Sequence, residues 1–173
     1  MKIYMTAVLF TVICAAIAVG EDRLPKPPEL KVLEKFVGTW DCQEVARPAI
    51  WTPIEKRSSS LEVNKMVLDG WYLQGRSQTP TGTTQALLMN TYDPSQKKYR
   101  IWKYTAGGPP TEYSGQWDEP SQTLTIEENT GGIVLKATFH LIDADHREYH
   151  VIARDGEGKV YLDIDGKVTR RKQ

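Results

Sequence analysis

The chain has 173 residues, with 22 basic and 22 acidic side chains and a formal net charge of zero. This balance leaves no strongly basic surface, so we expect no nucleic-acid partner. The hydrophobic share of 40% and the charged share of 25% are ordinary for a globular protein, and the length predicts one domain that buries its own core.

The first twenty residues have the composition of a secretory signal peptide. Met1 and Lys2 give a short positive start, residues 3–19 are almost wholly apolar, and small residues near 16–20 suit a signal peptidase. We predict a signal peptide at 1–20, a charged and proline-rich linker at 21–28 and the folded domain at 29–173. The protein would then be exported, periplasmic or secreted. An uncleaved anchor is the alternative, but the apolar stretch is slightly short for a span, and cleavage would leave no stable membrane span.

Cleavage would leave Cys42 as the only cysteine, which excludes an internal disulfide. No histidine lies near it in the sequence, so a small buried side chain is a better interpretation than a reactive thiol.

The domain opens with a short helix. Pro28 suits its first turn, Leu30, Leu33 and Phe36 recur at helical spacing, and Gly38 ends it after about two turns.

From Trp40 onward the apolar residues alternate with period two, which indicates half-buried strands, and turn residues separate the runs. Roughly ten strands are expected, near 38–47, 57–67, 70–78, 83–92, 97–105, 111–118, 121–128, 132–141, 146–154 and 159–170. Short consecutive strands favour an antiparallel meander that closes to avoid exposed edges. We predict an all-β fold: a closed up-and-down β-barrel of roughly eight to ten strands, with the helix capping one end. A two-sheet sandwich is the alternative.

Gly38 permits a sharp turn from helix to strand, after which Trp40 points inward. The string Leu33 to Trp40, L-x-x-F-V-G-T-W, resembles the opening of an uncharacterised bacterial family of exported lipocalin-like, or calycin-type, domains. Further segments are similar to the same family, at 68–74, 92–99, 113–124 and 169–171, so the resemblance covers about residues 28–172. It implies that a basic residue near the end, Arg170 or Arg171, packs over Trp40 as a barrel closure.

A related group, the nitrobindins, binds haem and opens with G-T-W-x-G-x-G. This chain lacks the two later glycines, and its three histidines, His140, His146 and His150, are expected on strand surfaces or at a turn. Their spacing on strands does not predict a metal site either. We therefore expect no haem, other cofactor or metal.

No catalytic constellation is visible. The serine run 58–60 lacks a nucleophile elbow, and carboxylates such as Glu62 are most simply solvated. An enzyme is the least favoured hypothesis.

Aromatic residues suggest a binding cavity, because five tryptophans and eight tyrosines are many for this length and glycines lie among them. We predict that the barrel binds a small apolar or amphipathic molecule, as a monomer or homodimer. The residues expected to line the cavity are Trp71, Arg100, Trp102, Tyr104 and Tyr113. The alternative is a filled barrel that acts as a non-catalytic interaction module of the cell envelope. Residues 46–57 motivate it, because Ile50 and Trp51 lie in a proline-bounded loop; that loop could equally be a lid over the barrel mouth.

Overall fold

The computed structural model describes residues 25–172. The predicted signal peptide at 1–20 and the first half of the predicted linker lie outside these residues. Helix α1 spans Leu30–Glu34, which is shorter than predicted. Three further backbone bonds of the i to i−3 type, the last from the amide of Val37 to the carbonyl of Glu34, continue the coil after it. The helical spacing of apolar residues therefore extends past the α-helix itself.

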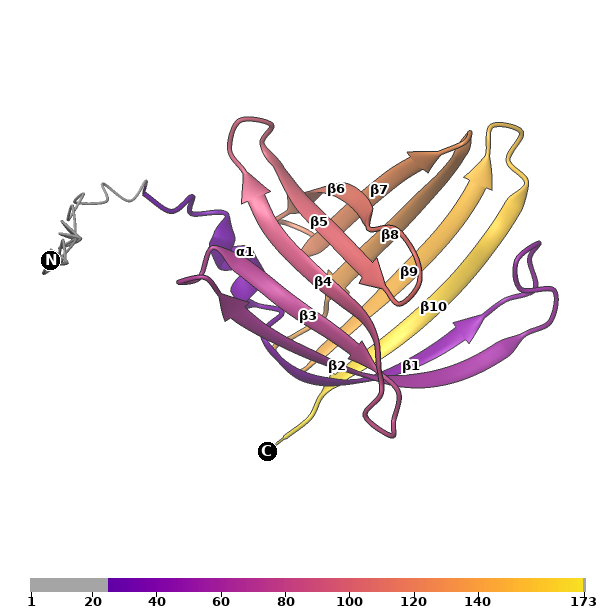
Figure 1. Cartoon of the computed structure of the whole chain (residues 1–173), viewed down its shortest axis with the longest axis horizontal. Coiled ribbons are helices and arrows are strands. Elements are labelled where there is room, and N and C mark those ends of the chain that lie inside the picture. Colours follow the sequence, from indigo (N-terminus) through magenta and orange to yellow (C-terminus); the bar gives the residue numbers. More distant parts are fainter. Residues whose placement is uncertain (1–24, 173) are drawn as a thin grey trace, which may run out of the picture.

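Ten strands follow in a continuous antiparallel meander (Figure 1). They are β1 Gly38–Ala46, β2 Lys56–Val67, β3 Tyr72–Gln78, β4 Thr84–Asp93, β5 Lys98–Thr105, β6 Thr111–Asp118, β7 Thr123–Thr130, β8 Ile133–Leu141, β9 His146–Asp155 and β10 Val160–Arg170.

The wall closes because the first and last strands pair with each other. Trp40 lies opposite Arg170, and the register continues to Ala46 opposite Ile164. The sheet is therefore a closed barrel in which each strand has two neighbours. The predicted all-β up-and-down barrel with a short helix is confirmed, and the sandwich alternative is wrong.

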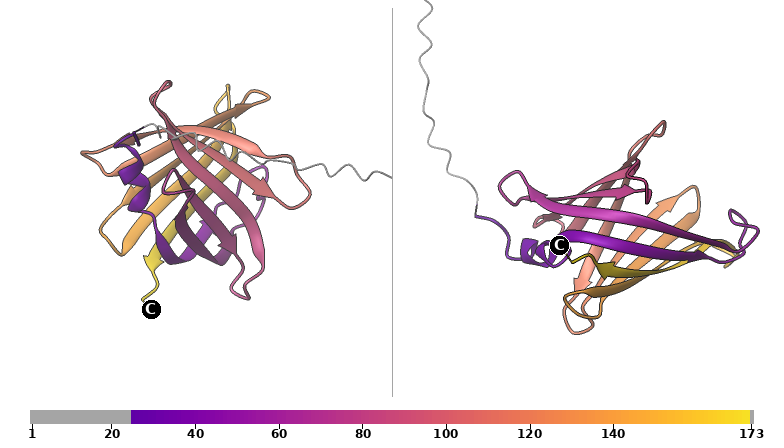
Figure 2. Two further views of the ribbon diagram at one scale, coloured as in Figure 1. Left: turned by 60° about the vertical axis from the view of Figure 1, so that its left-hand side comes forward. Right: turned by 90° about the horizontal axis from the view of Figure 1, so that it is seen from below.

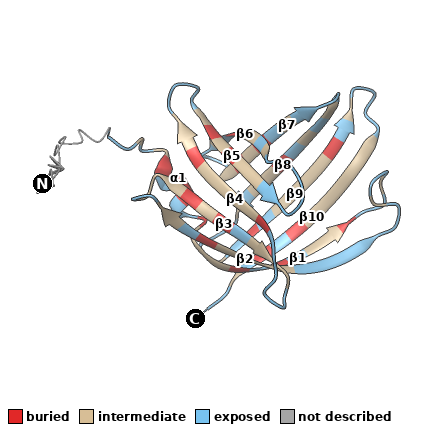
Figure 3. Ribbon diagram, in the orientation of Figure 1, coloured by how far each residue is buried: buried red, intermediate tan, exposed pale blue. Residues whose placement is uncertain are grey.

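Alternation sorts the side chains into an inner and an outer set. Trp40, Cys42, Leu73, Ile101 and Ala153 are buried inside, and their neighbours along each strand face outward. Figure 3 shows this as single buried positions separated by more exposed ones along the strands.

Helix α1 fills one end of the barrel, here called the closed end. Leu30, Leu33 and Phe36 pack there against strand residues such as Leu73 and Leu124. Figures 1 and 2 show α1 at this end and the loop between β1 and β2 at the opposite one. In the segment 25–172, no helix has both the length and the apolar character needed to cross a membrane.

Candidate functional site

The closed end is built around Trp40, whose indole is completely buried. Its Nε1 donates to the carbonyl of Phe36 at 3.0 Å. The guanidinium carbon of Arg170 lies 4.0 Å from the centre of the indole ring, a cation–π geometry. Arg170 also donates to the carbonyls of Val37 at 2.6 Å and Ala144 at 2.8 Å. It thus ties the last strand to the helix end and to the β8–β9 turn.

Gly38 and Arg171 have different parts in this closure. Gly38 has φ +133°, which side chains rarely permit, and an added Cβ would collide with Nη1 of Arg170. Arg171 is exposed and binds the Asp41 carboxylate through both Nε, at 3.1 Å, and Nη2. Of the two arginines named from the sequence, Arg170 is therefore the one over Trp40.

A second arginine, Arg147 on β9, lies beside the same tryptophan but points into the barrel. Only 4% of it is exposed. Its guanidinium carbon is 4.7 Å from the Trp40 ring centre and 5.5 Å from that of Phe36. The rings of Trp40 and Phe36 contact the guanidinium through cation–π interactions. They do not supply hydrogen-bond acceptors for its N–H groups.

An interior cavity of about 110 Å³ adjoins Arg147. One part of its wall is apolar, with side chains from β3, β4, β5 and β7, and the other part is polar. The lining residues are Phe36, Glu62, Asn64, Leu73, Gly75, Ser77, Leu88, Asn90, Ile101, Leu124, Ile126, Phe139 and Arg147.

Most polar groups of this wall bond to the protein. Asn90 donates to the carbonyl of Leu73 at 3.0 Å. Asn64 donates to the carbonyl of Phe36 at 3.1 Å and to the Glu62 carboxylate. These bonds fix the polar half of the cavity.

Arg147 is the exception. Within residues 25–172, its Nε and Nη2 are the buried side-chain nitrogens or oxygens that lack a hydrogen-bond partner. The Glu62 Oε2 atom lies 2.7 Å from Nη2, so the two charges form an ion pair, but not one with hydrogen-bond direction. The site is a nearly buried cation, only partly compensated, at the end of a half-apolar cavity.

The five side chains predicted to line the cavity divide into two groups. Trp71 and Tyr113 pack against the interior core, but neither lines the cavity beside Arg147. Arg100, Trp102 and Tyr104 lie on the outer face, since Ile101, between the first two, is buried inside and lines the cavity. Placing these three inside was an error of parity: both faces of β5 carry aromatic residues, so alternation alone did not identify the inner face.

Contacts with charged groups stabilise the outward placement of Arg100 and Trp102. Arg100 pairs with Glu112 and with Asp93, at 3.6 Å for the latter. Its guanidinium also lies 5.8 Å from the Trp102 ring centre. The inner face of β5 is formed instead by Tyr99 and Ile101.

The sequence analysis missed Arg147, although a signal for it was present. Arg147 has the same parity as Tyr149, Val151 and Ala153, the apolar set of its strand. Glu62 was expected to be solvated, yet it faces the cavity with 27% of its side chain exposed. In a barrel this parity places a charge inside, where burial makes it costly unless it is paired.

Other titratable groups fit their sequence interpretation. Cys42 is a buried free thiol, and burial is the main cause that raises its pKa to about 12. His140 and His150 are on the outer face, where they pair with Glu148 and Asp163. No group of three or more potential metal ligands is gathered among residues 25–172.

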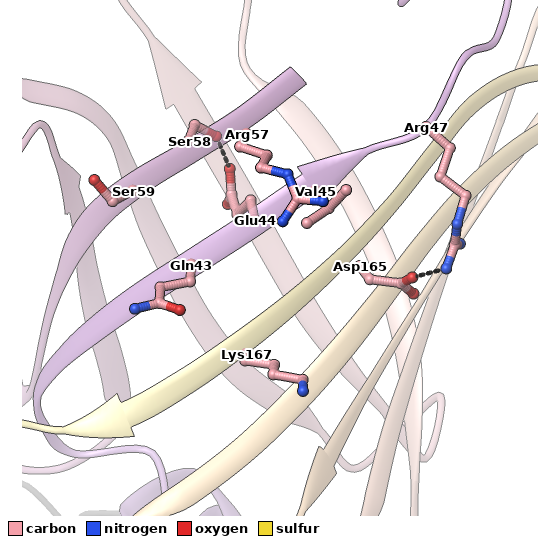
Figure 4. A pocket seen from close by; sticks show the side chains of 9 residues that line it. All are labelled: Gln43, Glu44, Val45, Arg47, Arg57, Ser58, Ser59, Asp165 and Lys167. Carbon is pink, nitrogen blue, oxygen red and sulfur yellow. Dashed lines mark hydrogen bonds and ion pairs between the residues drawn. The ribbon is translucent and has the colours of Figure 1, made fainter. Parts of the chain in front are cut away.

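A larger depression of about 680 Å³ lies along β1 near the opposite end of the barrel (Figure 4). Most of its lining side chains, such as Gln43, Val45 and Lys167, belong to the outer set. Arg47 reaches over to Asp165, and Ser58 donates to Glu44 at 3.0 Å. Because this depression is open on the outer surface and its arginines have carboxylate partners, we take the interior cavity as the candidate site.

The loop between β1 and β2 does not cover the barrel interior. Trp51 is about half exposed, and its ring meets that of Tyr161 edge-on at 5.6 Å. Tyr161 lies at an irregularity of β10 beside Val160, which pairs with the outer Arg154, so Trp51 packs at the rim and not over the interior.

Comparison with solved structures shows the same fold. An S-type phycobiliprotein lyase from Guillardia theta matches with a TM-score of 0.58 and 14% identity, covering 83% of this chain and 92% of that one. The protein Rv2717c from M. tuberculosis matches with a TM-score of 0.56 and 13% identity, covering 86% and 100%. At these identities the likeness extends to the fold alone.

No curated protein matches the sequence. Residues 26–170, almost the entire barrel domain, match a family described as "protein of unknown function (DUF1579)". The chain is therefore a member of the DUF1579 family.

Proposed function

We propose that this protein is an exported, lipocalin-like barrel that binds a small apolar or amphipathic molecule in its interior. The cavity beside Arg147 is the observation that carries the proposal. Leu73, Leu88 and Ile101 give it an apolar wall, while Asn64 and Arg147 supply polar groups at one end. Binding sites for small molecules combine these two features.

The size of the cavity limits what it holds. At about 110 Å³ it is smaller than the roughly 300–1,000 Å³ of sites for drug-sized ligands. We therefore expect a small molecule, or the head group of a longer one whose remainder extends toward the end opposite α1.

A fold relative is consistent with the proposal. One similar barrel is named a phycobiliprotein lyase, so this architecture occurs in a protein that acts on other molecules. Its particular activity is not carried over to this chain.

Native mass spectrometry of protein purified from its own host tests the proposal. We expect a reproducible small-molecule adduct. Leu88→Phe, which adds volume to the cavity wall, should remove it, whereas Leu87→Phe on the outer face of the same strand should keep it. A bare protein in repeated preparations would contradict the proposal. In the same preparations, the N-terminal sequence tests export: we expect it to begin near residue 21.

An interaction module is the second candidate function. Ile50, Trp51 and Ile54 are large apolar side chains of the β1–β2 loop that are 44–77% exposed. If this loop binds the cell envelope, Trp51→Ser should abolish co-sedimentation with envelope vesicles of the host and leave any interior adduct in place. Equal co-sedimentation of both proteins would exclude this function for the loop.

A further inference from the structure

We propose that the interior cavity binds the carboxylate of an aliphatic monocarboxylic acid through the Nε–H and Nη2–H groups of Arg147. The inference rests on the proposed function and names the class of ligand. Four observations support it: the open donors, the geometry of the guanidinium, the charge beside it and the apolar wall.

The first observation is the pair of buried donors. Arg147 is almost completely buried, with only 4% of its surface exposed, and its Nε and Nη2 lack hydrogen bonds. A buried charged donor without a partner is costly, so protein interiors rarely leave one unless something else binds it. A ligand oxygen in the cavity would satisfy both nitrogens.

The second observation is the shape of the open edge. Nε and Nη2 carry parallel N–H bonds, a spacing that matches the two oxygens of a carboxylate. The same chain shows this geometry in use, because Arg171 binds Asp41 through the same two nitrogens. Trp40 and Phe36 take up the ring-stacking contacts of the Arg147 guanidinium, which fixes the direction of that edge.

The third observation is the position of Glu62. Its carboxylate is close enough to Nη2 for an ion pair, yet it is also held by Asn64 and does not bond along the N–H direction. Glu62 therefore offsets part of the charge of Arg147 without filling its open edge. It also repels an incoming anion, so removing its charge should strengthen anion binding.

The fourth observation is the apolar part of the wall. Leu73, Leu88, Ile101, Leu124 and Ile126 line the same cavity. They would exclude the hydration shell that a small inorganic anion keeps, and they offer contacts to an alkyl chain. A monocarboxylate joined to such a chain fits both ends of the site.

Calorimetric titration at pH 7.5 with hexanoate and with 1-hexanol, on the full chain, tests the inference. The two probes share an alkyl chain and differ in the head group. We expect hexanoate to bind at least tenfold more tightly than 1-hexanol, because bonds to a charged partner are the stronger ones. Arg147→Gln should abolish this difference, and Arg171→Gln, the matched surface change, should preserve it.

If Arg147→Gln does not fold, a second variant, Glu62→Gln, tests the inference in its place. It should tighten hexanoate binding several-fold and leave 1-hexanol binding unchanged. If Arg147 and Glu62 were only a structural pair, Glu62→Gln would lower the unfolding midpoint and not favour hexanoate. That result, or equal affinity of both probes for the unmodified protein, would overturn the inference.

The results of these titrations distinguish failure of the carboxylate inference from failure of the proposed binding function. If 1-hexanol binds as tightly as hexanoate, and Leu88→Phe blocks both, the interior binds ligands but the carboxylate inference is wrong. If neither probe binds and the purified protein carries no adduct, the proposed function fails together with the inference.

Discussion

Gly38 is a residue of the closed end where a side chain would be both strained and in collision with Arg170. Its φ of +133° is strained for any side chain, and a Cβ there would displace Arg170 from Trp40. We expect Gly38→Ala to lower the free energy of unfolding by about 1–3 kcal/mol, the usual cost of such strain. Urea unfolding at neutral pH measures it. Gly156→Ala is the control, because a Cβ at Gly156 meets nothing within 4 Å; equal losses in both variants would contradict this account.

Cys42 should be chemically inert in the folded protein. Burial is the main cause that raises the pKa of its thiol to about 12, so almost none is thiolate at pH 8. In a Cys14→Ser background, we expect a thiol-reactive dye to leave the native protein unlabelled and to label it fully in urea. Native labelling at the rate of a free cysteine would show that the β1 wall opens readily.

Arg170 and Arg171, at the end of β10, connect this strand to other elements of the barrel. We expect them to contribute unequally to the free energy of unfolding. Arg170→Ala removes a cation–π contact of about 0.5–2 kcal/mol and hydrogen bonds of a charged donor of about 1.5–3 kcal/mol each. Because such terms are not additive, we expect a net loss of about 2–4 kcal/mol in unfolding free energy. Arg171→Ala should cost clearly less than Arg170→Ala, since Arg171 and its partner Asp41 are both exposed. Thermal or urea unfolding of the two variants measures these losses. A larger loss of unfolding free energy for Arg171→Ala would contradict the greater contribution expected of Arg170.

Strand β5 shows where sequence reasoning reached its limit. Alternation located the strand, and turn residues located its ends to within one residue. The inner face could not be identified, because Tyr99 and Ile101 alternate with Arg100 and Trp102 and both sets are aromatic-rich. Arg100 pairs on the outer face with Glu112 and Asp93, partners on neighbouring strands that only the register reveals.

The barrel as a unit was predictable, and its interior site was not. Ten alternating runs with short turns favour closure, and the G-T-W joint fixes which end the helix covers. The site depends on Arg147, Glu62 and Trp40 meeting inside the barrel, although they come from β9, β2 and β1. Such convergence follows from the shear and tilt of a closed sheet, which local patterns do not encode.

Stability of the barrel should fall in alkaline solution. Burial, followed by the hydrogen bond to Glu44, raises the pKa of Tyr149 well above its usual value near 10, and burial likewise raises that of Tyr99. Below about pH 10 these phenols are neutral in both states, so their full contribution is present. At higher pH the unfolded chain ionises and the folded one does not, so unfolding gains about 1.4 kcal/mol per pH unit for each group.

Urea unfolding between pH 8 and pH 11 measures this slope, with circular dichroism following the sheet. Tyr149→Phe keeps a ring over Gly166 and removes one ionisation, so its slope should be smaller than that of the unmodified protein. Identical slopes would mean that Tyr149 ionises equally in both states.

Closure by β1 and β10 also decides when folding can finish. Arg170 bonds to a residue 133 positions earlier, so the wall can close only after β10 has been synthesised. Until then β1 and β9 present unpaired backbone to other chains, a route to aggregation. A protein shortened by this one strand would therefore fail as a monomer, even though it retains every side chain of the cavity.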